Sequence, residues 1–224
     1  MSVAESMREK LLDAATILFT NKGFNGTSVR EIASKAGGNV SLISYYFGGK
    51  QGLLEALMID YLEGYLDVLE AEVKEKNDSA FEKIMNMAEK SLHYMKDNHL
   101  RARFVLREMT LDSMLIREIT STYLMKEKHL YSIILKKGMQ EGVFHKLPLS
   151  WTIMQFRGMV MMPFLHHQYV REVFQLHPQE SHFISVYKKE LRTWASKTLL
   201  RQKEELEKAF PLIAEIREYG AVKP

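Results

Sequence analysis

Apolar residues recur at intervals of three and four positions along nearly the whole chain, and no long run alternates apolar with polar residues. This spacing places the apolar side chains on one face of a helix, whereas a half-buried strand needs alternation. Proline, which interrupts helices, occurs only five times in 224 residues. The pattern predicts an all-α protein with helices over residues 6–21, 28–36, 40–47, 50–76, 80–97, 101–109, 113–140, 150–174 and 179–210.

The first helices carry capping signals at their ends. Ser6 with Glu9, and Ser28 with Glu31, fit the S-x-x-E capping box, in which each side chain satisfies a backbone N–H of the opening turn. Gly23 follows the first helix and suits the left-handed conformation that often ends a helix. The predicted boundaries therefore depend on side-chain chemistry as well as on spacing.

The short helix over residues 40–47 is expected to be the second helix of a helix-turn-helix unit. A glycine turn precedes it, Asn39 can cap it, and Val40, Ile43 and Phe47 share its inner face. In such units the second helix enters the DNA major groove, where hydroxyl groups contact bases or phosphates and an apolar side chain can meet a thymine methyl. The other faces of the helix carry Ser41, Leu42, Ser44, Tyr45 and Tyr46.

Two helix starts in this region offer sites for DNA phosphates. Lys50 opens the fourth helix, where its ammonium group adds to free backbone N–H groups and to the positive end of the helix dipole. Thr27 and Ser28 open the second helix, with Arg30 nearby. Capping alone also explains Thr27 and Ser28, and capping does not exclude a phosphate contact.

The two adjacent tyrosines pose a choice between core and surface. Tyr45 and Tyr46 cannot both lie in the core if the inner face is drawn correctly, so we expect one of them to pack. We assign Tyr46 to a phosphate contact and leave Tyr45 as either a groove residue or a packing residue.

Residues 23–57 closely resemble the N-terminal domain of TetR-family regulators, which carries a glycine-aromatic pair, a threonine-opened helix with Ile-Ala inside it, an Ala-Gly turn, Tyr-x-Phe and a following lysine. Three positions depart from that pattern: Asn39 replaces the usual serine or threonine, Ser44 replaces a frequent tyrosine, and Tyr46 replaces a frequent histidine. We expect backbone contacts to survive these changes and the base sequence that is read to differ. The matching residues are Gly23, Phe24, Thr27, Ile32, Ala33, Ala36, Gly37, Tyr45, Tyr46, Phe47 and Lys50.

The resemblance implies three parts: a helix-turn-helix DNA-binding domain over 1–50, a helical regulatory, ligand-binding and dimerisation bundle over 51–210, and a C-terminal tail over 211–224. It also implies a homodimer that pairs through its last two long helices and binds a palindromic double-stranded DNA site. Such a dimer would place its recognition helices about one DNA turn apart, ~34–36 Å. Most members of the family act as repressors under the control of an effector.

Composition and charge narrow the functional classes. The chain has no cysteine, no glycine-rich phosphate loop and no carboxylate pair placed for catalysis, so we expect neither an enzyme nor a cofactor. The N-terminus lacks an apolar signal core and no stretch is long enough to span a bilayer, so we expect a cytoplasmic, nucleoid-associated protein without membrane contact. Net charge is only +3, but residues 20–52 hold four basic residues and one acidic residue, which concentrates positive charge where DNA would dock.

The methionine-rich segment 151–170 has two interpretations. It fits a core and dimer seam, which we favour, or the adaptable wall of a ligand pocket. Pro163 is expected to kink its helix. A metal site is not expected, because adjacent histidines point apart on a helix and no carboxylate is spaced to join both; the histidines concerned are His166, His167, His177 and His182.

Residues 98–118 are rich in arginine. A solvated face explains these residues, and so does a docking surface for an acidic protein partner. Together with the recognition region, the segment resembles a branch of the TetR family linked to control of cell division, which implies regulation by a protein partner in place of a small effector. The arginines are Arg101, Arg103, Arg107 and Arg117.

Overall fold

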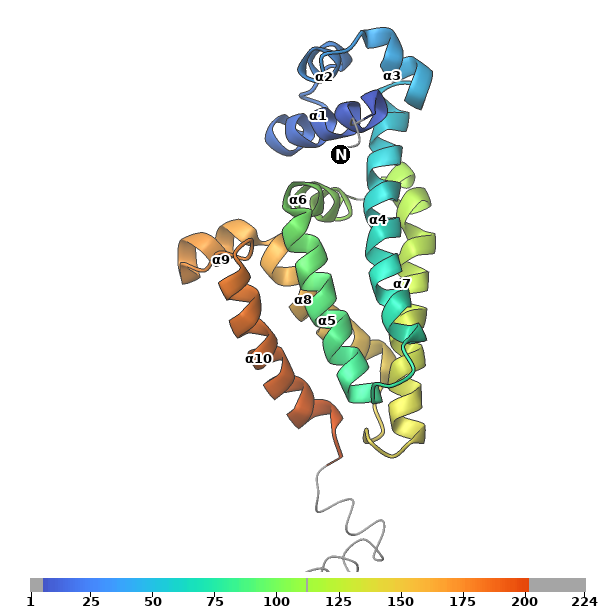
Figure 1. Cartoon of the computed structure of the whole chain (residues 1–224), viewed down its shortest axis with the longest axis vertical. Coiled ribbons are helices and arrows are strands. Elements are labelled where there is room, and N and C mark those ends of the chain that lie inside the picture. Colours follow the sequence, from blue (N-terminus) through green and yellow to red (C-terminus); the bar gives the residue numbers. More distant parts are fainter. Residues whose placement is uncertain (1–5, 112, 202–224) are drawn as a thin grey trace, which may run out of the picture.

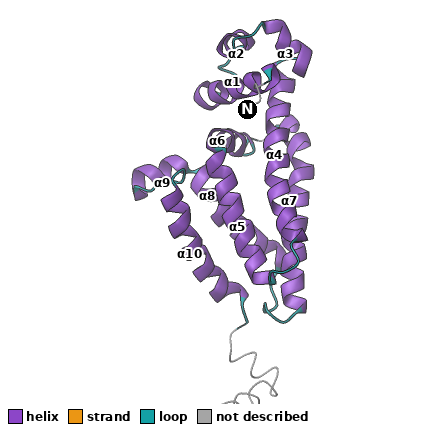
Figure 2. Ribbon diagram, in the orientation of Figure 1, coloured by secondary structure: helices purple, strands orange, loops and turns teal. Residues whose placement is uncertain are grey.

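The computed structural model describes residues 6–111 and 113–201, and the described elements are helices apart from one isolated β-bridge between Phe144 and Leu200 (Figure 2). The predicted all-α class is confirmed. No described helix is long and apolar enough to cross a membrane. The helices are α1 (Met7–Lys22), α2 (Val29–Lys35), α3 (Val40–Phe47), α4 (Lys50–Lys74), α5 (Ala80–Asp97), α6 (His99–Glu108), α7 (Met114–Gln140), α8 (Leu149–Leu165), α9 (His167–Phe174) and α10 (Ser181–Leu199).

The capping chemistry predicted for the first two helices is present. Ser6 accepts a hydrogen bond from the Glu9 backbone N–H, and the Glu9 carboxylate accepts one from the Ser6 N–H. Ser28 and Glu31 form the same reciprocal pair at the start of α2. Gly23 follows α1 with φ of +75° and ψ of 167°, so it is not in the left-handed helical conformation predicted for it, although its positive φ costs glycine little and other residues more.

Helix α4 connects the two parts of the molecule. Figure 1 shows α1, α2 and α3 gathered at one end, and α4 running from them along the whole bundle. Its buried face, which includes Leu53, Leu57 and Leu69, packs against α5 and α7. The boundary predicted at residue 50 falls at the first residue of this unbroken helix, and the division into domains there stays a prediction.

The second half of the bundle differs from the predicted helices at two places. Residues 150–174 form two helices, because α8 ends at Leu165 and α9 begins at His167. Pro163 lies inside α8 and cannot donate to the Met159 carbonyl, and this carbonyl instead accepts a hydrogen bond of 2.9 Å from Tyr187 of α10. The interruption at His166 follows Pro163 by about one turn. Instead of the single kinked helix that was predicted, one helix ends here and a second helix, α9, begins.

The last helix is shorter than predicted within the described residues. It begins at Ser181, after Pro178, and ends at Leu199, where Leu200 turns to pair with Phe144. The predicted helical residues 202–210 lie outside the described residues.

The buried tyrosines of the bundle are expected to make the fold sensitive to alkali. Burial raises the pKa of Tyr61, Tyr65 and Tyr131 above the ordinary value. The folded chain therefore retains these phenol protons after the unfolded chain has released its own. The stability that depends on them is complete below the unfolded pKa of about 10 and falls as pH rises above it. Phenolate absorbance from these residues should appear together with the loss of helical circular dichroism.

Tyr131→Phe supplies the control for that titration. The Tyr131 hydroxyl has no hydrogen-bond partner in the described part of the chain, so its removal should cost little stability. It should also reduce by one the number of phenolates that appear on unfolding. Ionisation of the three tyrosines while the helices remain intact would contradict the prediction.

Candidate nucleic-acid interface

The turn between α2 and α3 is built by backbone and side-chain hydrogen bonds. Gly37 adopts φ of +69°, and the Gly38 N–H donates to the Ala33 carbonyl at 2.9 Å, which closes α2. The Asn39 side chain then accepts from the Ser41 N–H at 3.0 Å and caps α3 as predicted. Ile43, 1% exposed, anchors α3 in the core. Two short helices joined by a tight turn are thus held on α1 and α4.

The outer side of α3 is polar and aromatic. Ser41 and Ser44 are exposed, Leu42 is half-buried, and Tyr45 and Tyr46 are 80% and 40% exposed. The two tyrosine rings meet edge to face with centroids 5.0 Å apart, so each ring limits the freedom of the other.

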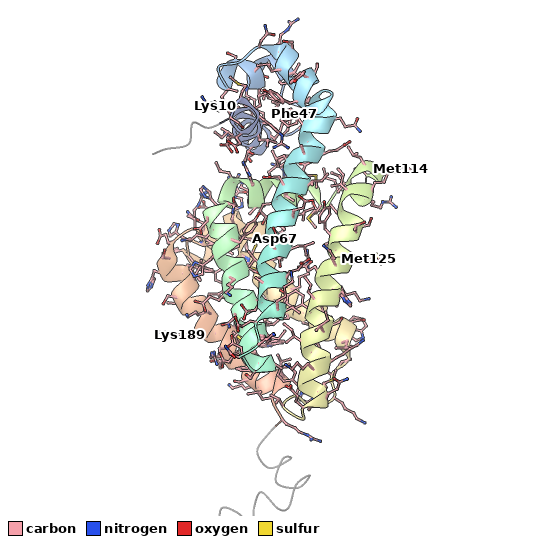
Figure 3. The ribbon with its side chains drawn as sticks, turned by 45° about the vertical axis from the view of Figure 1, so that its right-hand side comes forward. Lys10, Phe47, Asp67, Met114, Met125 and Lys189 are labelled. Carbon is pink, nitrogen blue, oxygen red and sulfur yellow. The ribbon has the colours of Figure 1, made fainter. Side chains whose placement is uncertain are left out.

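Two expectations about this helix were wrong. Val40 was placed on the inner face, yet it is 37% exposed, because it occupies the first residue of α3 and projects beyond the core. One of the tyrosines was expected to pack, but both are exposed. Phe47 is half-buried where α3 meets α4 (Figure 3) and fills the remaining inner position.

Lys50 is held at the start of α4 by an aromatic ring. Its ammonium nitrogen lies 4.3 Å from the centroid of the Phe24 ring, a distance typical of a cation–π contact. In the described structure α4 has Gly49 at its N-cap and no side chain that caps it. The free N–H groups of the first turn and the Lys50 charge therefore face the same region, where an anion would be stabilised.

The residues at the start of α2 have different environments. Ser28 and Arg30 are exposed, in agreement with a surface role. Thr27 is only 2% exposed, and its hydroxyl donates to the Gly23 carbonyl at 2.9 Å. The predicted phosphate contact of the Thr27 side chain is therefore corrected: this side chain stabilises the turn after α1, and the proposed contact surface omits it.

The basic side chains around α2 are not equally available to an anion. Lys22 pairs with Glu31 at 2.6 Å, and hydrogen bonds from Lys22 and Ser28 lower the pKa of Glu31 to about 2. In contrast, Arg30 and Lys50 have no carboxylate partner among the residues that the structure describes. The charge that remains unpaired thus lies beside α3.

Sequence reasoning missed the aromatic supports of this surface. Besides Phe24 under Lys50, the Phe47 ring lies 5.5 Å from the guanidinium carbon of Arg8 on α1. The glycine-aromatic pair at Gly23 and Phe24 was a usable signal for the first contact. No local pattern indicated the second, because Arg8 and Phe47 are far apart in sequence.

Comparison with known proteins identifies the family. Residues 11–57 match the family described as bacterial regulatory proteins, tetR family. Over 190 residues the chain is 43% identical to the probable HTH-type transcriptional regulator YttP of Bacillus subtilis (strain 168), across 84% of this chain and 92% of YttP. The chain belongs to the TetR family. It is a transcriptional regulator and not an enzyme.

Solved structures share the fold of this TetR-family regulator along both halves of the chain. FadR of Bacillus subtilis, in complex with stearoyl-CoA, has a TM-score of 0.68 at 20% identity over 82% of this chain and 97% of FadR. AibR, in complex with isovaleryl coenzyme A and operator DNA, has a TM-score of 0.68 at 16% identity over 84% of this chain and 97% of AibR. At these identities the likeness shows the fold alone.

The arginine-rich segment of this TetR-family chain holds its two halves together. The Arg101 guanidinium bonds Asp13 of α1 at 2.8 Å and Asp60 of α4 at 2.6 Å. Arg107 donates to the Phe19 carbonyl of α1 at 3.1 Å. These two side chains are thus engaged within the chain and not free for a partner. Arg103 lies beside α9, and Arg117 is exposed on α7.

Substitutions of Lys50 and Tyr46 test the proposed phosphate contacts through DNA affinity and its dependence on salt. Lys50→Gln should weaken binding to all duplexes to a similar degree and reduce the slope of log affinity against log salt by about 1. Tyr46→Phe removes only an uncharged hydroxyl, so it should weaken binding by about 1 kcal/mol without changing the slope. Fluorescence anisotropy on several duplexes over a range of salt measures both effects.

Lys74→Gln is the matched control for this experiment. Lys74 ends α4 at the opposite end of the helix and pairs only with Glu70 in the described structure, so the same loss of charge should leave DNA affinity unchanged. A loss at Lys50 that affects one duplex and spares the others would show base reading and reject the phosphate role.

Proposed function

We propose that this protein is a homodimeric, sequence-specific DNA-binding repressor whose affinity for DNA is controlled by an effector bound in the C-terminal bundle. The observation that carries the proposal is the exposed polar and aromatic side of α3, with the unpaired Lys50 at the adjoining start of α4. A helix of this kind reads base edges from the major groove while helix starts bind the flanking phosphates.

We assign roles to the residues on the outer side of α3 from the exposure of their side chains. Ser41, Ser44 and Tyr45 are exposed and are assigned to bases, while the half-buried Leu42 is assigned to a thymine methyl. Tyr46 and Lys50 are assigned to phosphates, together with Ser28, Arg30 and the capping residue Asn39. AibR, which shares the fold, was solved with operator DNA, and this supports a DNA-binding role for this chain.

Dimerisation is proposed through α8 and α10. Trp151 and Met154 on α8 are 63% and 56% exposed, and a groove of about 670 Å³ between α8 and α10 is lined by Met159, Met162 and Trp194. Large exposed apolar side chains on one face mark an interaction surface. A second copy of the chain would cover them, and the twofold symmetry of the pair calls for a palindromic site.

Gly158 adds an independent reason for that surface. It lies within α8, where glycine costs roughly 1 kcal/mol relative to alanine. A Cβ atom at Gly158 would meet nothing within 4 Å in the chain, so internal packing does not require a glycine there. The close approach of the backbone of a second copy of the chain would require a glycine at this position.

The effector is proposed to enter the bundle beside Glu127 and Arg157. Between α4, α6, α7 and α8 lies a cavity of about 10 Å³, room for about one water molecule, lined by Tyr61, Tyr65, Glu127 and Arg157. An adjacent surface groove of about 380 Å³ is lined by Glu127 and Arg157 as well as by Leu124. The ion pair thus separates the groove from the interior.

The polar groups of this interior favour a ligand site. Arg157 and Tyr65 both donate to the buried Glu127 carboxylate, at 2.7 and 3.0 Å, while the Tyr61 and Tyr131 hydroxyls have no partner in the described part of the chain. Buried hydroxyls without partners are costly unless water or a ligand satisfies them. FadR and AibR were each solved with an acyl-coenzyme A, so acyl thioesters are the class to test first.

The alternative function, a regulator of cell division that binds a protein through the arginine-rich segment, has less support. Arg101 and Arg107 hold α1, and removing them for a partner would release the DNA-binding domain. We therefore favour the small effector over the protein partner.

Mapping bound sites tests the proposed function. Purified protein should protect a palindromic duplex whose half-sites are about one DNA turn apart, ~34–36 Å. Tyr45→Ala should change which bases are preferred at a few positions, because Tyr45 is assigned to bases. Protection without any sequence preference would reject a specific regulator, and binding to isolated half-sites with undiminished affinity would reject the dimer.

Gly158→Glu tests the dimer surface. The substitution places a charge on the proposed seam, so light scattering should report a shift from dimer to monomer while the helical signal persists. Met125→Glu is the control, because Met125 is 72% exposed on α7 (Figure 3), outside the proposed surface. A Gly158→Glu protein that remains dimeric would exclude this face.

A further inference from the structure

A second pocket, separate from the effector cavity, lies between α6, α9 and the segment that leads into α10. Its volume is about 220 Å³, and its polar lining comes from His99 and Arg103 of α6, His167 and Arg171 of α9, and Gln179. Among its described lining residues there is no carboxylate. In Figure 1 these helices meet on the side of the bundle, away from α3. The pocket is therefore basic and stands apart from the DNA surface.

The positive charges of this pocket are poorly compensated. Within the described ranges no carboxylate pairs with Arg103, and burial together with Arg107 and Arg171 lowers the pKa of its guanidinium. Arg171 bonds Glu172 at 2.7 Å, but Glu172 does not line the pocket. Two guanidinium groups thus face one space with a single carboxylate at its margin.

His167 lines the same pocket and has an unsatisfied buried nitrogen. Its Nδ1 is buried and has no hydrogen-bond partner in the described structure. Burial lowers the pKa of the imidazole, and the neighbouring Arg103 and Arg171 lower it further. The imidazole is therefore neutral near pH 7 and adds no positive charge to the repulsion between the two guanidinium groups.

The starts of two helices add to the basic side chains. His99 and Leu100 belong to the first turn of α6, and His167 is the first residue of α9. In the residues that the structure describes, no side chain caps either helix. Each start directly follows another helix, because Asn98 ends α5 and His166 ends α8, so the helix dipoles oppose each other there and the support for an anion comes from the free N–H groups of the two first turns.

We propose that this pocket binds the phosphoryl group of a phosphorylated small molecule. The planar guanidinium groups of Arg103 and Arg171 match a phosphoryl group through paired N–H donors. The pocket is larger than a phosphate ion requires, and Leu100 and Phe164 offer apolar walls for the rest of the ligand. The site lies on α6, whose Arg101 and Arg107 hold α1, so the ligand would sit within about one helical turn of the contacts to the DNA-binding domain.

Calorimetric titration of the full chain, without DNA, tests this site independently of the proposed function. Inorganic phosphate, pyrophosphate and adenosine 5′-diphosphate are compared with sodium chloride at equal ionic strength. We expect pyrophosphate to bind and chloride to give no saturable heat. Stronger binding of the diphosphate nucleotide would support a ligand with an organic portion, and equal binding of pyrophosphate would support the phosphoryl group alone.

Single substitutions assign the binding to the pocket. Arg103→Gln and Arg171→Gln should each weaken pyrophosphate binding about tenfold or more, because each removes charge-assisted hydrogen bonds. Arg192→Gln is the matched control, since Arg192 pairs with Glu82 on the surface of α10 and does not line the pocket. Circular dichroism confirms folding of each variant. Wild-type affinity in both pocket variants, or an equal loss in Arg192→Gln, would overturn the proposal.

Discussion

The guanidinium group of Arg101 joins the three helices on which the position of the DNA-binding surface depends. It bonds Asp13 of α1 and Asp60 of α4 while its own backbone lies in α6. Exposed ion pairs are worth little individually, but these two share one planar donor and are reinforced by the Arg107 bond to the end of α1. The stacked rings of Phe19 and Phe104, 5.4 Å apart, fill the space beneath them.

This junction determines how a change in the bundle can reach α3. Helix α4 is unbroken over 25 residues, and its first residue is Lys50, the proposed phosphate contact. Helix α6 touches α1 from below and also contributes a wall to both the interior cavity and the basic pocket. A ligand that shifts α6 relative to α4 must therefore either tilt α1 or break the Arg101 and Arg107 contacts. Both outcomes would change the position of α3 relative to the bundle.

The sequence predicted those features that depend on residues close together in the chain. The capping boxes at Ser6 and Ser28, the cap at Asn39 and the all-α class follow from residues within a few positions of one another, and the structure contains them. The exposed side of α3 was predicted in part, because Ser41 and Ser44 are exposed as expected, whereas Val40 and one of the two tyrosines were expected to pack.

The features that the sequence did not predict depend on contacts that were not visible in the local pattern, most of them between residues far apart in the chain. Arg101 and Arg107 were interpreted as a solvated face or a docking surface, yet their partners Asp13 and Phe19 lie 88 residues earlier in the chain. Thr27 looked like a phosphate ligand until its burial against the Gly23 carbonyl was seen. The hydrogen bond from Tyr187 to the Met159 carbonyl, which Pro163 leaves free, joins residues 28 positions apart and was not predicted.

The interior of the bundle is more polar than stability alone explains. Replacing a buried ion pair with apolar residues of similar volume is often neutral or stabilising, yet the core holds Glu127 with Arg157 and places Tyr61 and Tyr131 beside it with unsatisfied hydroxyls. One water molecule in the 10 Å³ cavity could satisfy a few of these groups. The Arg157 side chain retains 32% exposure toward the neighbouring groove, whereas the Glu127 side chain is 4% exposed, so opening the pair would leave the buried carboxylate with the Tyr65 hydroxyl as its donor. A ligand that bound here and accepted from the Tyr61 and Tyr131 hydroxyls would satisfy groups that have no partner in the described structure, so a ligand site explains the polar core better than stability does.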